Sequence, residues 1–449
     1  MADKKPNVLF IAIDDLRPQL ACYGRDQMRT PNIDGLADRG VLFRQAYCQV
    51  PVCGATRASL LTGVRPARDR FVDYFTWAEK DLPGALTLPE HFRKEGYTTR
   101  SLGKVFHHLT DCADRSWCGD PWRPETSGSW RDYQDPENRR LDESPGHRGP
   151  AYESLDVPDD AYFDGKVANR ACREMETLCG DDEPWFLAVG FIKPHLPFNA
   201  PKTYWDYYPE SDVNLADNPF APHGAPEEAM HNWAELRQYF DIPAEGPVSE
   251  EMACNLVHGY YAATSYTDAQ VGKVLRQLDA LGRRDDTIII LWGDHGWQLG
   301  EHGLWCKHCN FDTSLNAPLM ISAPDLHTAA ATDQLVEFVD VYPTLCHLAG
   351  IPIPDHCEGD SLAPVLQTPS EPLKSAVFSR YHSGDSIRTG DHLYTEWTDE
   401  DGNVTARMLY DHAADPDENV NIAAGSDNAD LVEALSEQLH AGWTAAREG

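Results

Sequence analysis

The sequence contains no uninterrupted apolar run of about 18 residues, the length that a membrane-spanning helix needs. It is also short of basic residues: 38 Lys and Arg stand against 72 Asp and Glu, so the formal net charge is −34. The acidic residues are spread along all 449 residues and form no acidic tail. Such a chain repels nucleic acids and anionic membranes, so we expect neither as a partner, and an anionic substrate requires a local basic pocket.

Cysteine is too sparse for a disulfide scaffold, since 12 cysteines without a repeated spacing are distributed over the whole length. The chain also lacks a segment of the signal-peptide type near its start. Its first apolar run, Asn7–Ile13, is seven residues long and leads directly into two aspartates, which is typical of a core strand. We therefore expect a cytoplasmic protein as numbered, or a periplasmic or secreted one if a signal segment has been removed.

Several short apolar runs each end in a polar cluster. Continuous apolar runs fit strands buried on both faces, as in a parallel sheet covered by helices. In such α/β sheets, ligands bind beyond the carboxyl ends of the strands. The sequence therefore predicts one large α/β domain whose site receives polar residues from four strands: Asn7–Ile13 with Asp14-Asp15, Tyr97–Leu102 with Gly103-Lys104, Trp185–Phe191 with Lys193-Pro194-His195, and Thr287–Trp292 with Gly293-Asp294-His295.

The rest of the chain predicts helices, irregular excursions and a second, smaller unit. A composition change near Pro369–Pro372 suggests a catalytic domain over residues 1–370 and a C-terminal subdomain over 371–449. Residues 111–158 and 194–247 are rich in turn-forming residues and are expected to wall a pocket. The expected elements are helices at Tyr260–Leu281, Leu335–Leu348 and Asn428–Arg447, and short antiparallel strands at Ala376–Arg380, Asp385–Trp397 and Arg407–Tyr410.

The sharpest motif is Pro51–Gly63, PVCGATRASLLTG. It matches the signature of formylglycine-dependent sulfatases, Cys-x-Pro/Ala-x-Arg followed by a helix-forming stretch with Leu-Thr-Gly. In that family the Cys is oxidised to formylglycine, whose hydrate attacks sulfur. A position at a helix start favours a bound anion, and Arg57 lies one turn further on. The alternative for Cys53 is a buried structural thiol.

A second constellation is a candidate site for a hard cation. Asp14, Asp15, Asp294 and His295 follow two of the predicted strands and supply three carboxylates and an imidazole. Carboxylate oxygens suit Ca²⁺ or Mg²⁺, whereas His is an unusual ligand for these ions. The alternatives are a helix N-cap for Asp14-Asp15 and an ordinary loop pair for Asp294-His295.

A third set of residues is basic. Lys104 and His107 lie in LGKVFHH, His195 in FIKPHLPF, and Lys307 in EHGLWCK. Hydrolysis of a sulfate monoester requires donors for the sulfate oxygens and an acid for the leaving alcohol. Each of these residues, taken alone, is equally compatible with a surface position.

Together, these motifs resemble an iduronate-2-sulfatase-type member of the type I, formylglycine-dependent sulfatase family. The matching segments run from residue 7 to about residue 423 and include NVLFIAIDDLRP, LGKVFHH, FIKPHLPF, GDHGWQLGEHGLW and YDHAADPDENVN. The resemblance implies an alkaline-phosphatase-like α/β fold with a smaller C-terminal subdomain. It also implies a sulfuric ester hydrolase acting on a sulfated carbohydrate, such as a 2-O-sulfated uronic acid of a polysaccharide, and a formylglycine-generating or sulfatase-maturating enzyme as partner.

The resemblance further assigns roles to single residues. It implies that Ca²⁺ is bound by Asp14, Asp15, Asp294, His295 and modified Cys53, and it accounts for the unusual histidine ligand. Arg57, Lys104 and His107 would serve the formylglycine and the sulfate, with His107 as base. His195 and Lys307 would lie at the leaving-group side, with His195 as acid. Trp297 and His308 are further residues expected to bind the substrate, with His308 at the rim of the pocket.

Three departures and two rival functions remain open from the sequence. Ala55 replaces the commoner Pro of the signature, His308 stands where close relatives have Tyr, and Cys306 and Cys309 form a C-x-x-C pair around Lys307 that could bind zinc or act in redox chemistry. One rival is a phosphonate or phosphate ester hydrolase of the same superfamily. The other is a non-catalytic carbohydrate-binding protein in which Cys53 stays a thiol.

Overall fold

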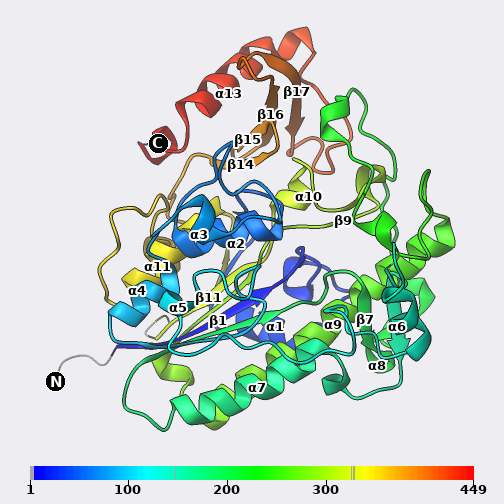
Figure 1. The fold of residues 1–449 in the computed structure, drawn as a ribbon. Coiled ribbons are helices and arrows are strands. Elements are labelled where there is room, and N and C mark those ends of the chain that lie inside the picture. The colour runs from blue at the N-terminus through cyan, green and yellow to red at the C-terminus, as the bar shows by residue number, and fades with distance from the viewer. Residues whose placement is uncertain (1–4, 147, 325, 327–328, 449) are drawn as a thin grey trace.

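The computed structural model describes residues 5–146, 148–324, 326 and 329–448. Its centre is a seven-stranded, mainly parallel sheet in the order β12-β2-β11-β8-β1-β6-β4, with helices on both faces (Figure 1). The strands are β1 (Asn7–Ile13), β2 (Val41–Phe43), β4 (Thr98–Gly103), β6 (Trp185–Phe191), β8 (Thr287–Gly293), β11 (Leu319–Ser322) and β12 (Ala330–Thr332). Four expected strands, β8, β1, β6 and β4, are adjacent and parallel. β11 runs antiparallel between β8 and β2.

The helices divide between the two faces of this sheet and the connections above it. Alternate residues of β1 point to opposite faces, as strand geometry requires: Phe10 packs with α2, α4 and α11, and Ile11 packs with α1, α7 and α9. The helices are α1 (Pro31–Ala37), α2 (Cys53–Thr62), α3 (Ala78–Asp81), α4 (Leu88–Lys94), α5 (Ala113–Ser116), α6 (Pro136–Asp142), α7 (Phe163–Leu178), α8 (Lys202–Trp205), α9 (Glu250–Ala280), α10 (Asp312–Leu315), α11 (Val341–Leu348), α12 (Ala363–Gln367) and α13 (Ala429–Ala441).

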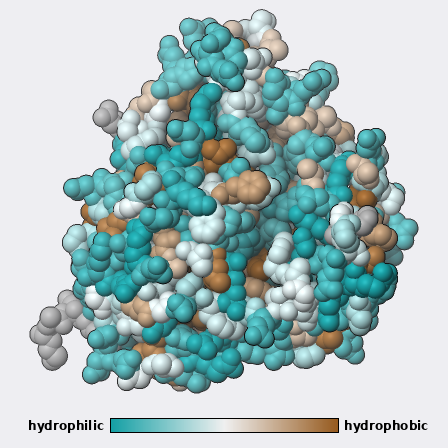
Figure 2. Space-filling view, in the orientation of Figure 1, coloured by the Kyte–Doolittle hydropathy of each residue, from teal (hydrophilic) through white to brown (hydrophobic). Residues whose placement is uncertain are grey.

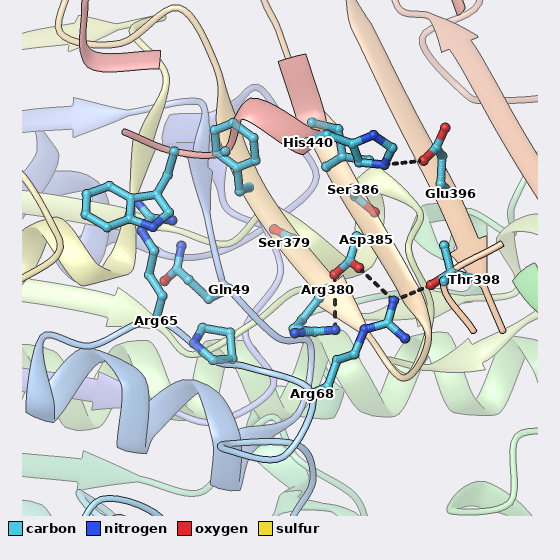
Figure 3. Close-up of a pocket in the computed structure, with 16 residues that line it drawn as sticks. Gln49, Arg65, Arg68, Ser379, Arg380, Asp385, Ser386, Glu396, Thr398 and His440 are labelled. Carbon is cyan, nitrogen blue, oxygen red and sulfur yellow. Dashed lines mark hydrogen bonds and ion pairs between the residues drawn. The ribbon is translucent and has the colours of Figure 1, made fainter. Parts of the chain in front are cut away.

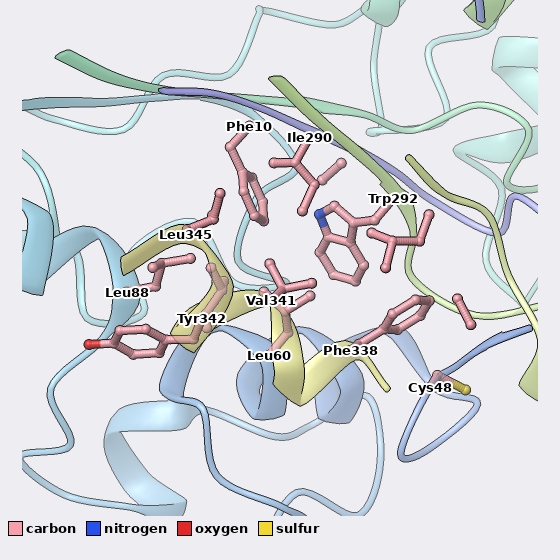
Figure 4. Close-up of a cluster of buried hydrophobic side chains, with 14 of the residues drawn as sticks. Phe10, Cys48, Leu60, Leu88, Ile290, Trp292, Phe338, Val341, Tyr342 and Leu345 are labelled. Carbon is pink, nitrogen blue, oxygen red and sulfur yellow. The ribbon is translucent and has the colours of Figure 1, made fainter. Parts of the chain in front are cut away.

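The core under α2 fixes the helix that carries Cys53. Figure 4 shows Phe10, Ile290 and Trp292 of the sheet pointing toward Leu60 of α2 and Tyr342 of α11. All of these side chains are at most 1% exposed. The apolar contacts therefore hold α2 rigidly against the sheet. The molecular surface seen in Figure 2 is mostly hydrophilic, with hydrophobic residues scattered over it. No helix among the described residues is both long and apolar enough to cross a membrane.

Small sheets attach the remaining segments to this centre. β3 (Ala46–Tyr47) pairs with β13 (Val336–Glu337), β5 (Tyr152–Leu155) with β7 (Phe198–Pro201), and β9 (Gln298–Leu299) with β10 (Trp305–Cys306). A four-stranded antiparallel sheet near the C-terminus consists of β14 (Val377–Tyr381), β15 (Gly384–Arg388), β16 (His392–Thr398) and β17 (Val404–Asp411). α13 covers one face of this sheet, and the other face packs toward the large domain through Trp397, Met408 and Tyr410 (Figure 1).

Several boundaries differ from the sequence expectation. α9 begins ten residues earlier than expected, because Ser249 accepts a hydrogen bond from the N–H of Met252 and caps the helix. The helix expected from Leu335 begins only at Val341, since Val336–Glu337 forms a strand with β3. The single strand expected over Asp385–Trp397 is the hairpin β15–β16, and the last long helix stops at Ala441 before Gly442.

Candidate active site

The carboxyl ends of four parallel strands meet at one edge of the large sheet. Ile13 at the end of β1 pairs with Phe191 of β6 on one side and with Gly293 of β8 on the other. β4 ends beside β6, where Gly103 pairs with Gly190. This register brings together the polar residues that follow the strands, namely Asp14, Asp15, Lys104, His195, Asp294 and His295.

Cys53 joins this edge as the first residue of α2, with 3% of its surface exposed. The preceding residue, Val52, supplies no side-chain cap to the helix. The next residue must be glycine, because a Cβ at Gly54 would come within 2.6 Å of the carbonyl oxygen of Asp73. The start of α2 thus presents N–H groups and the positive end of the helix dipole to an anion beside Cys53.

Arg57 is completely buried below this position and binds the carboxylates on either side. Its Nε lies 2.8 Å from Oδ2 of Asp294, and one Nη lies 3.1 Å from Oδ1 of Asp14. The other Nη donates to the carbonyl oxygens of Lys104 and Val105. Arg57 therefore connects the ends of β1, β4 and β8 to α2, and its donors are directed at protein acceptors.

Two groups of buried ligand atoms lie here, each with its atoms within 4.8 Å of one another: Cys53 with Asp294 and His295, and Asp14 with Asp15 and His195. Nε2 of His295 is buried, has no hydrogen-bond partner among the described residues, and lies 3.4 Å from Oδ1 of Asp15 and 3.6 Å from Oδ1 of Asp294. Carboxylate oxygens with an unpartnered imidazole nitrogen suit a hard divalent cation. Asp14, Asp15, Asp294 and His295 therefore fit the expected Ca²⁺.

The electrostatics of the two neighbouring aspartates differ. Burial opposes ionisation of Asp14, but Lys104 and Arg57 hold the pKa of its carboxyl well below its usual range. Burial raises the pKa of Asp15 well above its usual value, and Asp14 adds to this effect although Lys307 opposes it. A divalent cation between these carboxylates would favour the ionised form of both.

One functional candidate, Glu235, was missed in the sequence. It comes from the excursion over residues 194–247, and its Oε2 lies 2.8 Å from Nζ of Lys307 while Oε1 lies 3.2 Å from Nε2 of His195. Lys307 also lies 3.1 Å from both carboxylate oxygens of Asp15. Burial opposes ionisation of Glu235, yet Lys307 and His195 hold its pKa far below the usual range. The surrounding residues, HNWAELR, form no motif that identifies this glutamate as a site residue. The sequence predicted only that the excursion over residues 194–247 lines a pocket.

The other excursion, residues 111–158, supplies Trp130 and Arg123. The ring of Trp130, which is 41% exposed, lies edge-on to His195 with centroids 5.3 Å apart. Arg123 donates to the carbonyl oxygens of Gly103, Phe106 and His107 at 3.0–3.2 Å. Arg123 therefore holds the loop that carries Lys104 and His107, and it does not extend into the pocket as a free cation.

His107 lies in that loop as a half-buried ring. Burial and the nearby Lys104 lower its pKa to about 3, so the imidazole is neutral at neutral pH. Its Nδ1 is buried without a hydrogen-bond partner among the described residues. The unpartnered nitrogen is able to accept a hydrogen bond, and a negative charge beside it would have to raise this pKa before the ring takes up a proton.

Trp297, which is also expected to bind the substrate, is 1% exposed, and its ring lies 4.9 Å from Nζ of Lys307. Trp297 therefore supports Lys307 from the core side. His308 is half-buried, with ring centroids 6.0 Å from Tyr381 and 6.2 Å from His231. The C-x-x-C cysteines, Cys306 and Cys309, are both buried free thiols.

Comparison with known proteins agrees with this geometry. Residues 6–351 match the family model described as Sulfatase, and residues 300–444 match the model described as N-sulphoglucosamine sulphohydrolase, C-terminal. The chain belongs to the sulfatase family. The expected recognition as a type I sulfatase is thereby confirmed, and the chain is a sulfuric ester hydrolase.

Individual relatives of this sulfatase extend over nearly all of it. Iduronate 2-sulfatase of Mus musculus is 32% identical over 96% of this chain and 93% of its own. A protein solved in complex with its substrate, D-glucosamine-2-N,6-O-disulfate, has a TM-score of 0.76, 22% identity and 99% coverage of both chains. The phosphonate monoester hydrolase of Agrobacterium radiobacter has a TM-score of 0.78, 24% identity and coverage of 97% and 95%. These likenesses confirm the expected alkaline-phosphatase-like α/β fold with a small antiparallel sheet in the C-terminal region.

Proposed function

We propose that this sulfatase hydrolyses O-sulfate esters of a carbohydrate, namely a 2-O-sulfated uronic acid or a related sugar of a sulfated polysaccharide. The observation that carries the proposal is the position of Cys53, buried at the start of α2 and grouped with Asp294 and His295. The 32% identity to iduronate 2-sulfatase supports a sulfated uronate as the substrate.

We further propose that Cys53 is converted to formylglycine by a formylglycine-generating or sulfatase-maturating enzyme, and that Asp14, Asp15, Asp294 and His295 hold Ca²⁺ beside it. Hydrated formylglycine supplies the oxygen nucleophile for sulfur, and the cation supplies positive charge for a sulfate oxygen. Arg57 fixes the carboxylates of Asp14 and Asp294 and so sets the geometry of this group.

The remaining residues bind the ester and move protons. The ammonium groups of Lys104 and Lys307, which pair with Asp14 and Asp15 respectively, would be shared with the charged sulfate oxygens when the ester binds. The neutral ring of His107 is the base. Nδ1 of His195 lies 2.6 Å from the carbonyl oxygen of Leu196, which fixes the ring so that Nε2 faces the leaving alcohol. Burial and Lys307 lower the pKa of His195 well below its usual value, and the negative charge of a bound sulfate acts in the opposite direction.

The experiment that tests the nucleophile is a peptide-mass measurement on protein made together with a maturation enzyme. We expect the peptide containing residue 53 to have lost its sulfur and the preparation to release sulfate. Cys53→Ala should abolish turnover and keep the fold, whereas Cys254→Ala, a half-buried control thiol, should stay active. A fully active protein with an alkylatable thiol at position 53 would contradict the proposal, and an inactive one would favour the non-catalytic carbohydrate-binding alternative.

The second candidate is a phosphonate or phosphate ester hydrolase, which the TM-score of 0.78 to a phosphonate monoester hydrolase favours. Sulfate, phosphate and phosphonate esters all present charged oxygens to the same cationic groups. The geometry of the site therefore does not distinguish a sulfatase from a phosphonate or phosphate ester hydrolase. Rates on matched sulfate, phosphate and phosphonate esters of one alcohol separate them, and we expect the sulfate ester to be cleaved fastest.

A further inference from the structure

A second cavity of about 360 Å³ lies between the C-terminal sheet, the end of α13 and the loop that follows α2 (Figure 3). Three arginines line it in a chain whose net charge is −34. The residues that line it include Arg65, Arg68, Arg380, Asp385, His440 and Trp443.

The guanidinium groups of this cavity exceed the carboxylates that pair with them directly. Asp385 alone serves two arginines, with its oxygens 3.6 Å from Arg68 and 3.2 Å from Arg380. Nη2 of Arg380 is buried and makes no hydrogen bond of good geometry among the described residues. Burial and the like charge of Arg68 lower the pKa of Arg380, although Asp385 and Asp69 oppose this effect. A bound anion would relieve this crowding of positive charge.

The cavity also contains an aromatic wall beside these donors. Arg65, which is 7% exposed, lies with its guanidinium 4.9 Å from the ring centroid of Trp443. Both of its Nη atoms donate to the carboxylate of Glu337, and only its Nε is buried without a hydrogen-bond partner in the described part of the chain. Phe378 also lines the cavity. Apolar ring surface combined with a few convergent charged donors is typical of a small-ligand site, and an anionic sugar ring offers both an apolar face and a charged substituent.

Both walls of the cavity continue to the rim of the active site. The loop that carries Arg68 runs on to Tyr74, whose Cα would be 2.8 Å from a Cβ at Gly54, next to Cys53. On the other wall, Arg380 is followed in β14 by Tyr381, whose ring centroid lies 6.0 Å from that of His308. Two continuous chain segments therefore link the cavity to the active site.

We propose that this cavity binds a second anionic sugar unit of a polymeric substrate while another unit is in the active site; this inference rests on the proposed carbohydrate sulfatase function. Arg68 and Arg380 bind the sulfate or carboxylate of that unit, and Trp443 contacts the sugar ring. Inorganic sulfate could bind to the same arginines through the same charged oxygens. The experiment must therefore distinguish a bound sugar unit from a bound sulfate ion.

The test is calorimetric titration of the calcium-loaded Cys53→Ala protein, which cannot turn the ligand over. The ligands are a sulfated tetrasaccharide, the matching monosaccharide sulfate and inorganic sulfate. The variants are Arg68→Gln, whose side chain is 49% exposed, Trp443→Ala, and Arg173→Gln as an exposed control on α7. Tetrasaccharide binding should weaken about tenfold in Arg68→Gln, the equivalent of about 1.4 kcal/mol. Monosaccharide binding should change less than twofold, and Arg173→Gln should change neither.

Three results would overturn the inference. The first is a tetrasaccharide that binds the unsubstituted cavity no more tightly than the monosaccharide. The second is an equal loss for both saccharides in Arg68→Gln and in Trp443→Ala. The third is inorganic sulfate binding that depends on Arg68 while tetrasaccharide binding does not. None of these results would contradict the proposed function. That function would be contradicted separately if protein with modified Cys53 released no sulfate from any sugar ester.

Discussion

Oε1 of Glu235 lies 3.2 Å from Nε2 of His195, the nitrogen that we propose donates a proton to the leaving alcohol. The other oxygen of the same carboxylate lies 2.8 Å from Nζ of Lys307. One half-buried carboxylate from an irregular excursion therefore contacts an imidazole and an ammonium group that belong to two other segments. We expect it to position both groups.

Glu235→Gln should lower kcat about 10- to 100-fold on a sugar sulfate, as is typical when a residue that orients functional groups is lost. KM should stay level or fall, because a negative charge close to the bound sulfate is removed. Steady-state kinetics checks both values, with the exposed Glu228→Gln on the same excursion as control. An unchanged kcat would show that the carboxylate has no part in positioning His195 and Lys307.

Chelation of the metal should lower both activity and melting temperature, because a cation that binds only the folded state stabilises it. Asp14→Asn and Asp294→Asn should lose stoichiometric metal, and their melting temperatures should no longer respond to the chelator. Elemental analysis and thermal unfolding provide the measurements, and the exposed Asp26→Asn is the control. Full metal content in the two variants would place the cation elsewhere.

His195→Ala should slow sugar sulfates far more than nitrophenyl sulfates. An acid matters most when the departing alkoxide is strongly basic, and acid catalysis typically contributes about 10²–10⁴-fold. The ratio of kcat/KM for the two substrates is the measurement. An equal loss of kcat/KM on both substrates would exclude the acid role of His195 and show that it only binds sulfate.

Sulfated uronate disaccharides should be better substrates than neutral sulfated sugars of the same linkage. Because the chain carries a net charge of −34, moderate salt should improve capture of the doubly anionic sugar by screening surface repulsion, while close contacts in the pocket are screened less. Measuring kcat/KM against ionic strength tests this expectation. If the neutral sugars are cleaved equally well, the uronate assignment fails and the sulfatase assignment stays.

Lys374→Met should destabilise the protein by about 3–5 kcal/mol, since it removes the buried ammonium group that pairs with Asp340 and leaves Glu337 with Arg65 alone. Lys374 is 2% exposed in its side chain and lies 2.6 Å from both Glu337 and Asp340. These bonds join the segments that we propose as the catalytic domain, 1–370, and the C-terminal subdomain, 371–449. Denaturant unfolding measures the change; adding Asp340→Asn should recover part of it, and the exposed Lys202→Met should have little effect.

The central sheet and the residues at its edge follow from local patterns in the amino-acid sequence. Apolar runs such as Asn7–Ile13 and Thr287–Gly293 lack any alternation, so both of their faces must be buried, and only a sheet covered by helices on both sides provides this. Because parallel strands end at the same edge, Asp14 and Asp294 had to lie near one another. The Cys53 motif and its helix are equally local.

Packing between segments that are distant in the sequence determines which residues of the long excursions reach the site. Glu235 and Trp130 lie in segments without hydrophobic periodicity, so the path of these segments is set by packing against distant elements and not by local preference. Packing also placed the ring of Trp297 4.9 Å from Nζ of Lys307, a contact that no local pattern in the sequence predicts. The cavity around Arg68 and Arg380 has the same origin, since it exists only where the C-terminal sheet meets the loop after α2.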